Sequence, residues 1–155
     1  MTEMTSLWKK VENLVVVFQY RNEEHYRAFR KELDVMLNDS KVKMLDIIVT
    51  IPGEIKKEDL PPHRLIHFIS PKDFNWLDKM KGDLLDSVFS KKYDLVINFG
   101  HDIPGLDKQL KKLKVKFHVG VNTSVKDVDI HVKCKGTDMH EMVSFAKQTL
   151  EKLSA

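Results

Sequence analysis

Cysteine is nearly absent from this sequence of 155 residues, which contains Cys134 alone. A single thiol excludes an internal disulfide and a cysteine-based zinc cage, and it suits a reducing compartment. Residues 1–12 carry charge throughout and lack the apolar core of a signal peptide. The longest apolar run, Leu14 to Phe18, is far shorter than the roughly 20 residues that cross a bilayer. We therefore expect a soluble, cytoplasmic protein without a membrane partner.

Glycine is scarce, and it is missing where a phosphate-binding loop needs it. The turn that follows the first predicted strand reads Gln19-Tyr20-Arg21-Asn22, so neither a dinucleotide fingerprint nor a P-loop is present. The histidines form no HExxH motif. His63 and His67 are spaced as on a helix but lie at the start of a predicted strand. The sequence predicts no cofactor and no metal site.

Charge of one sign is not in large excess. Lysine and arginine number 26 against 23 acidic residues, and the net charge of +3 is too small to imply nucleic acid by itself. The hydrophobic content of 42% is that of a globular protein. A chain of this length buries roughly 70% of its unfolded surface around one core. We expect one domain over residues 1–155, with residues 1–12 as a lead-in that contains a helical turn near Leu7 and Trp8.

Apolar runs and amphipathic segments alternate along the chain. The run from Leu14 to Phe18 suits a strand covered on both faces, and Asn22 is placed to cap the helix after it. Further strands are predicted over residues 42–50, 65–69, 93–99, 116–119 and 128–133, and further helices near 84–89, over 104–113 and after a capping Thr137. Alternating polarity over residues 128–133 indicates an edge strand. The order predicts an α/β fold, namely a three-layer α-β-α sandwich with a mostly parallel sheet of about six strands, Rossmann-like or flavodoxin-like.

Three segments in the middle of the chain carry a resemblance: Asp73-Phe74-Asn75-Trp76, Tyr93 to Asn98, and Lys116 to Gly120. On these, the sequence resembles a family of small, uncharacterised single-domain proteins from bacteria of the Bacteroidetes group. The resemblance extends over residues 12–150 in element order, and it implies the fold type but no activity. The same part of the chain is weakly similar to the acceptor-side domain of heptosyltransferase-type glycosyltransferases. It departs from them at Leu113-Lys114-Val115, so transfer chemistry is not carried over.

Polar residues follow the predicted central strands. In an open parallel sheet, ligands bind outside the carboxyl ends of the strands, where the strand order reverses. If the strands at 14–18 and 93–99 are neighbours, the crevice lies between residues 19–21 and 98–102, with residue 122 alongside. The candidate ligand-binding residues are Gln19, Arg21, Asn98, His101, Asp102 and Asn122. The alternative is that these are ordinary polar loop residues.

Two interpretations are open for several of these residues and for Cys134. His101 beside Asp102 has acid–base potential, but Asp102 is also placed to cap the helix that starts near Pro104, and we favour the cap. We therefore assign no catalytic residue. Arg21 is placed to hold an anion near a helix N-terminus. The alternative is an ordinary loop arginine that is exposed to solvent. Cys134 lies between two lysines that would lower its pKa, although a packed thiol is the commoner role.

A basic stripe follows the turn at residues 100–105. It consists of Lys108, Lys111, Lys112, Lys114 and Lys116, and Phe74 and Trp76 add stacking surface if they are exposed. Such a surface suits RNA. We favour the other interpretation, in which the lysines form a solvated face and the two aromatics fold under their loop.

The sequence thus favours a non-catalytic binding or interaction domain with an unknown protein or small molecule as its partner, present as a monomer or homodimer. A glycosyltransferase-like enzyme or binder of a sugar or phosphorylated ligand, using Asn98, His101, Asp102 and Asn122, is the first alternative. Association with RNA or the ribosome through the lysine stripe is the second.

Overall fold

A six-stranded, entirely parallel sheet forms the centre of the computed structural model, which describes residues 6–123, 128–135 and 138–153. Its strands lie in the order β3-β2-β1-β4-β5-β6, which is the Rossmann order rather than the flavodoxin order. The prediction of a layered α/β fold is confirmed. The strands are β1 (Asn13–Gln19), β2 (Met44–Thr50), β3 (Ile66–Ile69), β4 (Lys92–Asn98), β5 (Lys114–Val121) and β6 (Ile130–Val132).

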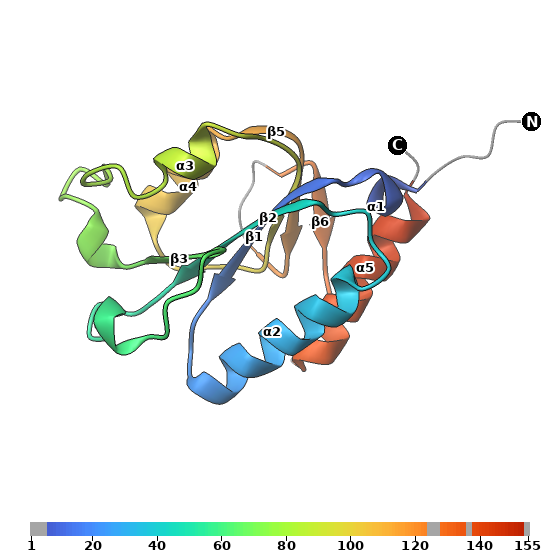
Figure 1. The fold of residues 1–155 in the computed structure, drawn as a ribbon, viewed down its shortest axis with the longest axis horizontal. Helices are drawn as coiled ribbons and strands as arrows, with labels where there is room; N and C mark the ends of the chain where they lie inside the picture. The colour runs from blue at the N-terminus through green and yellow to red at the C-terminus, as the bar shows by residue number, and fades with distance from the viewer. Residues whose placement is uncertain (1–5, 124–127, 136–137, 154–155) are drawn as a thin grey trace, which may run out of the picture.

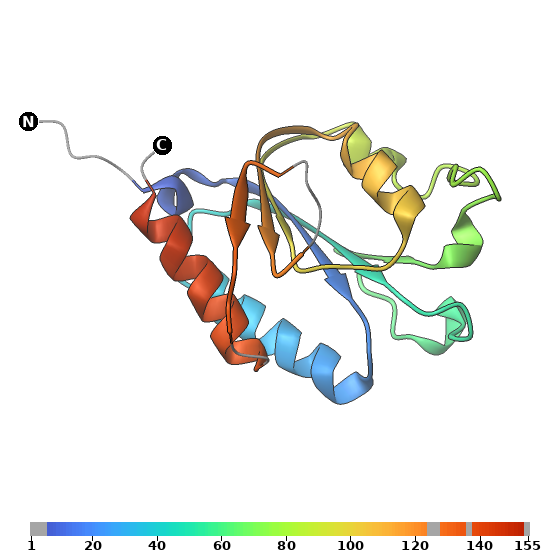
Figure 2. The same cartoon turned by 180° about the vertical axis from the view of Figure 1, so that it is seen from behind.

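Helices cover both faces of the sheet (Figures 1 and 2). The two longest lie on one face with the first short helix, and the other two α-helices lie on the opposite face. The helices are α1 (Leu7–Lys10), α2 (Glu23–Leu37), α3 (Asp86–Phe89), α4 (Pro104–Leu110) and α5 (Met139–Lys152), with short 3-10 turns η1 (Lys57–Asp59) and η2 (Pro71–Asp73).

The central strand β1 explains why its sequence is continuously apolar. Leu14, Val16 and Phe18 pack into the core under α2 and α5, whereas Val15 and Val17 pack into the core under α3 and α4. All five side chains are buried. Because β1 pairs with β2 on one side and β4 on the other, the strand order reverses at the boundary between β1 and β4.

The two long helices begin at capped ends. The Oδ1 atom of Asn22 accepts a hydrogen bond from the backbone N–H of His25 at 2.7 Å, which confirms the predicted cap of α2. At α5 the corresponding residue is Asp138, which accepts from the N–H of His140 at 3.0 Å. The predicted cap, Thr137, lies outside the described residues.

The ends of the described chain meet at one end of the molecule. The N–H of Leu7 donates to the carbonyl of Leu153 at 2.7 Å, and the helical turn expected near Leu7 and Trp8 is α1, with both side chains buried. Strand β6 is an edge of the sheet, as the alternation over residues 128–133 predicts, and β3 is the other edge. Among the residues that the structure describes, no helix is both long and apolar enough to traverse a bilayer.

Candidate functional site

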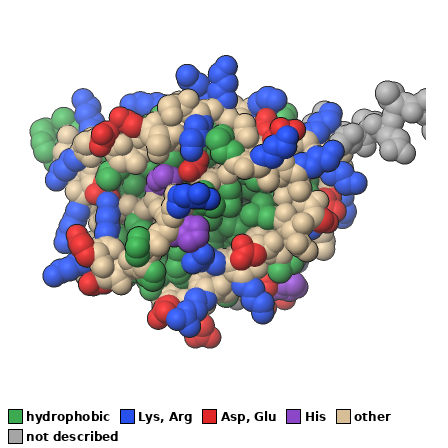
Figure 3. Space-filling model, in the orientation of Figure 1, with side chains coloured by type: hydrophobic (Ala, Val, Ile, Leu, Met, Phe, Trp, Pro, Cys, Tyr) green, Lys and Arg blue, Asp and Glu red, His purple; other side chains and the backbone are tan. Residues whose placement is uncertain are grey.

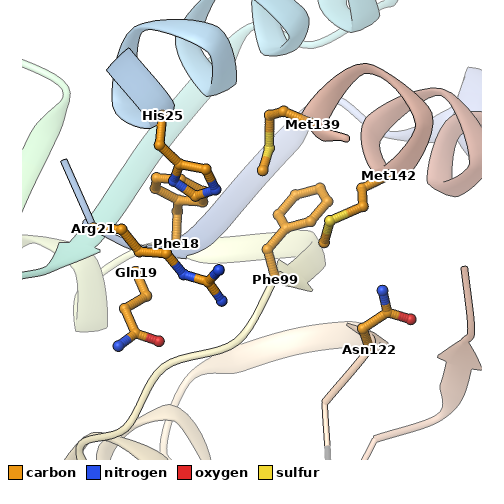
Figure 4. A pocket seen from close by; sticks show the side chains of 8 residues that line it. All are labelled: Phe18, Gln19, Arg21, His25, Phe99, Asn122, Met139 and Met142. Atoms are coloured by element: carbon orange, nitrogen blue, oxygen red, sulfur yellow. The ribbon is translucent and has the colours of Figure 1, made fainter. Parts of the chain in front are cut away.

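A cavity of about 170 Å³ opens at the carboxyl edge of the sheet, beside the ends of β1 and β4 (Figure 4). This is the place where parallel sheets of this type bind ligands. Strand ends and the first turns of α2 and α5 supply its walls. The cavity is lined by Phe18, Gln19, Arg21, His25, Phe99, Asn122, Met139 and Met142.

The cap of α2 places the two basic groups of the cavity. Strand β1 ends at Gln19, and the capping bond from Asn22 fixes the first turn of the helix. Arg21 therefore lies just before the helix, and Figure 4 shows its guanidinium extending into the space in front of Phe99. His25 lies in the first turn, with its ring stacked on Phe18 at 5.1 Å between centroids and 20° between planes.

One nitrogen of the His25 imidazole lacks a hydrogen bond within the described part of the chain, which is unusual for a buried polar atom. This nitrogen is Nδ1, which is buried and has no hydrogen-bond partner among the described residues. Burial lowers the pKa of His25 below its ordinary value, and the positive charge of Arg21 lowers it further. The positive end of the α2 dipole faces the same space. An anion at this position would therefore meet a guanidinium and a helix N-terminus, and its negative charge would oppose the effects that lower the pKa of His25.

Part of the remaining wall of the cavity is apolar and adaptable. Phe99 continues β4 beyond its last paired residue and packs edge-on against Phe29, with ring centroids 5.6 Å apart. Met139 and Met142 come from the first turn of α5 and point their thioethers toward Phe99 (Figure 4). Methionine adjusts its shape to what it contacts. None of the eight lining residues is a serine, cysteine, lysine or carboxylate, so the lining provides a binding surface and only one group, His25, that titrates near neutrality.

The structure brings together three of the six predicted ligand-binding residues. Gln19, Arg21 and Asn122 all line the cavity. Asn122 adopts a left-handed backbone conformation with φ of +52°, and its side-chain amide is already engaged. It donates to the carbonyl of Cys134 at 3.1 Å and accepts from the N–H of the same residue at 2.8 Å. Asn122 therefore extends the pairing of β5 and β6 and forms a rigid rim of the cavity.

Asn98 and His101 have structural positions instead. The Oδ1 atom of Asn98 accepts from the N–H of Gly100 at 2.8 Å and so shapes the turn after β4. The side chain of His101 is only 1% exposed. Its Nδ1 accepts from the N–H of Ile103 at 3.0 Å, and its Nε2 lies 2.8 Å from Oδ1 of Asp107. Because Nδ1 accepts, we assign the ring proton to Nε2, which donates to Asp107.

Both interpretations of the pair of His101 and Asp102 are wrong. The carboxylate that contacts His101 belongs to Asp107, one turn into α4. Asp102 is exposed and does not cap that helix, because the N-cap residue is Ile103, without a side-chain bond. Adjacent residues of a turn point in different directions, whereas residues 101 and 107 are brought together by the start of α4. Asp102 does not line the cavity.

The two aromatic residues considered for an interaction surface differ in their exposure to solvent. Phe74 is buried beneath α4, as the favoured interpretation predicts, whereas Trp76 is 88% exposed, so that interpretation is wrong for Trp76. The lysine stripe is partly neutralised: Lys108 lies 3.8 Å from Asp78, and Lys116 lies 3.3 Å from Asp94. The other lysines of the stripe, Lys111, Lys112 and Lys114, are exposed. Figure 3 shows basic and acidic side chains intermingled over the face that it presents.

A second polar cluster, which the sequence did not reveal, surrounds Asp46. This buried carboxylate accepts from the hydroxyl of Tyr93 at 2.6 Å, lies 3.0 Å from Nε2 of His67, and accepts from Nζ of Lys91 at 3.1 Å. Burial by itself raises the pKa of Asp46, but these three hydrogen bonds outweigh it and hold the pKa below its ordinary value. Asp46 and Tyr93 lie in the first halves of β2 and β4, away from the carboxyl edge of the sheet. Its one sequence signal was a single charge inside the apolar run of β2.

Four residues of the cavity wall and His25 were not predicted from the sequence. The signal for His25 was its place in the first turn after the central strand. Met139 and Met142 gave no signal, because only the packing of α5 beside α2 brings them to this edge. Over residues 6–123, 128–135 and 138–153, no group of three His, Cys, Asp or Glu side chains is arranged to hold a metal ion.

Comparisons with known proteins give the family and nothing about its chemistry. A search of curated proteins found no match. A family of unknown function, DUF6913, matches the sequence over residues 2–153, nearly its whole length. The chain therefore belongs to this family of unknown function.

Proposed function

We propose that this protein is a non-catalytic binding domain that holds a small organic anion in the cavity between β1 and β4. One observation carries the proposal: the guanidinium of Arg21 and the imidazole of His25 line the same cavity at the strand ends, beside an apolar wall. Arginine pairs with carboxylates and phosphates through two parallel hydrogen bonds. His25, whose pKa is low without a ligand, would take up a proton when the anion binds.

The cavity also limits the size and the character of the ligand. Its volume of about 170 Å³ is smaller than the roughly 300–1,000 Å³ typical of drug-sized ligands. The apolar wall of Phe18, Phe99 and the two methionines suits a short aliphatic or aromatic part. We infer a ligand with one acidic group at Arg21 and a compact apolar body against Phe99.

The glycosyltransferase-like alternative needs Asn98, His101, Asp102 and Asn122 around one ligand. Of these four residues, Asn122 alone lines the cavity, so no observation favours a sugar-transfer site over a binding site. The RNA alternative needs a continuous basic surface, whereas Asp78 and Asp94 pair with two of its lysines. We therefore retain the anion-binding proposal.

The test is a calorimetric titration with benzoate and, as its neutral counterpart, benzamide. We expect benzoate to bind and benzamide to bind at least about tenfold more weakly, because a charge-assisted hydrogen bond contributes about 1.5–3 kcal/mol. Arg21→Gln should remove this preference. Arg64→Gln is the matched control, because Arg64 is exposed, precedes β3 and does not line the cavity. Equal binding of benzoate and benzamide, or full benzoate affinity in Arg21→Gln, would disprove the proposal.

A further inference from the structure

A small hairpin forms the end of the molecule opposite the chain ends (Figure 1). Phe74 and Met80 form an antiparallel bridge, and the N–H of Asn75 donates to the carbonyl of Lys79 at 2.8 Å. The Oδ1 atom of Asn75 accepts from the N–H groups of Leu77 and Lys79 at 2.9 and 3.0 Å. We call residues 74–80 the hairpin. Its two tip residues are Trp76 and Leu77.

Helix α4 holds the hairpin so that its tip projects. Phe74 packs so closely on Gly105 that a Cβ atom at that glycine would lie 2.5 Å from the phenyl ring. Lys108 of the same helix lies 3.8 Å from Asp78. The tip is therefore held by the buried Phe74 side chain and by hydrogen bonds within the turn, yet Trp76 is 88% exposed and Leu77 is 46% exposed. Tryptophan is normally largely buried, so an ordered tryptophan held in water indicates a contact site.

A groove of about 600 Å³ lies beside the second half of the hairpin, between it and helices α3 and α4. Met80 and Phe89 are its apolar lining residues, and Gly82 leaves its backbone uncovered on that side, with no atom within 4 Å of where a Cβ would be. Lys79 and Lys112 line the groove from the hairpin and from the residues after α4. One surface thus carries an apolar projection and an apolar depression next to each other.

We propose that this surface binds a second copy of the same chain, with Trp76 of each copy inserted into the groove of the other. A two-fold dimer needs one patch that is complementary to itself, and a projection beside a depression meets that need. The charges agree, because Lys79 and Lys112 share the surface with the exposed carboxylates of Asp83 and Asp86. Figure 3 shows both signs of charge beside apolar side chains at this end. Such a patch can pair with its own copy, whereas a polyanion would meet repulsion from the two carboxylates.

This inference is independent of the anion cavity, which lies at the carboxyl edge of the sheet. The test is sedimentation of the full chain over a wide concentration range. We expect a monomer–dimer equilibrium that Trp76→Ala weakens at least about tenfold, as expected for an aromatic anchor. Phe145→Ala is the control, because Phe145 is also an exposed aromatic but lies on α5. It should leave the equilibrium unchanged.

Fluorescence identifies the surface that associates. The only other tryptophan, Trp8, is buried, so a Trp8→Phe variant reports Trp76 alone. Its emission should shift to shorter wavelength as dimer forms. Three results would overturn the proposal: a monomer at every concentration, a dimer in which Trp76 emission does not change, or binding of RNA or lipid vesicles by Trp76 without self-association.

Discussion

Replacing Asp46 with asparagine tests whether the buried polar cluster on β2 stabilises this fold. The substitution keeps the shape of the side chain and removes its charge. In the native protein the carboxylate accepts from Tyr93 at 2.6 Å and from Lys91 at 3.1 Å, and it lies 3.0 Å from His67. An asparagine amide retains one acceptor oxygen but presents an NH2 group to the remaining donors.

The expected cost follows from these contacts. A hydrogen bond to a buried charged group contributes about 1.5–3 kcal/mol, and removing one member of a buried ion pair costs about 3–5 kcal/mol. Lys91 is more than one third exposed, so its share is screened by water. We therefore expect Asp46→Asn to lower the free energy of unfolding by about 3 kcal/mol. Tyr93→Phe, which removes one donor, should cost less.

The assay is urea denaturation followed by circular dichroism at neutral pH. Asp39→Asn serves as the control, since the Asp39 carboxylate pairs with Lys147 on the surface, and it should leave the midpoint unchanged. Acid unfolding adds a second criterion. Because the folded pKa of Asp46 is below the unfolded value, its contribution is present above about pH 4 and is lost as the pH falls through the folded pKa. A loss below about 1 kcal/mol in Asp46→Asn would refute this account of the cluster.

Two other positions give predictions of the same kind. Gly105→Ala should lower the free energy of unfolding by about 1–3 kcal/mol in the same denaturation assay, because its Cβ would clash with Phe74 and the carbonyl of Asp78. Gly53 has room for a Cβ, so Gly53→Ala should cost little. Equal effects of the two changes would contradict the close packing of the hairpin on α4. Burial lowers the pKa of His118 and the charge of Asp129 only partly opposes it, so folding should weaken as the pH falls below about 6.5. His118→Gln should flatten this dependence in thermal melts between neutral pH and pH 5; an unchanged slope would refute the assignment.

The fold was predictable because local signals and burial agree. The run from Leu14 to Phe18 required cover on both faces, and β1 indeed lies at the centre of the sheet with helices on each side. Asn22 indicated the start of α2, because its side chain can accept a hydrogen bond from the first turn of a helix. The strand order was not predictable from these signals. It depends on which strands each crossover brings together, and no single residue encodes that.

The site was predictable only where it follows directly from a strand end. Gln19 and Arg21 reach the cavity because β1 is central, but Asn98 turns back to bond Gly100. His101 is buried because α4 places Asp107 within reach of its ring. Phe74 is buried because Gly105 leaves room for it. Each of these outcomes depends on contacts between elements that are distant in sequence, so the sequence pattern alone did not separate them.

The central claim is that the cavity beside β1 binds an anion through Arg21 and His25. Titrating the ring signals of His25 by NMR, with and without saturating benzoate, tests it most directly. Without ligand the pKa of His25 should lie below its ordinary value, because of burial and the nearby Arg21 charge. With benzoate the pKa of His25 should rise, whereas the ring signals of the exposed His131, which does not line the cavity, should not respond to benzoate. A pKa of His25 that does not respond to benzoate would contradict the claim.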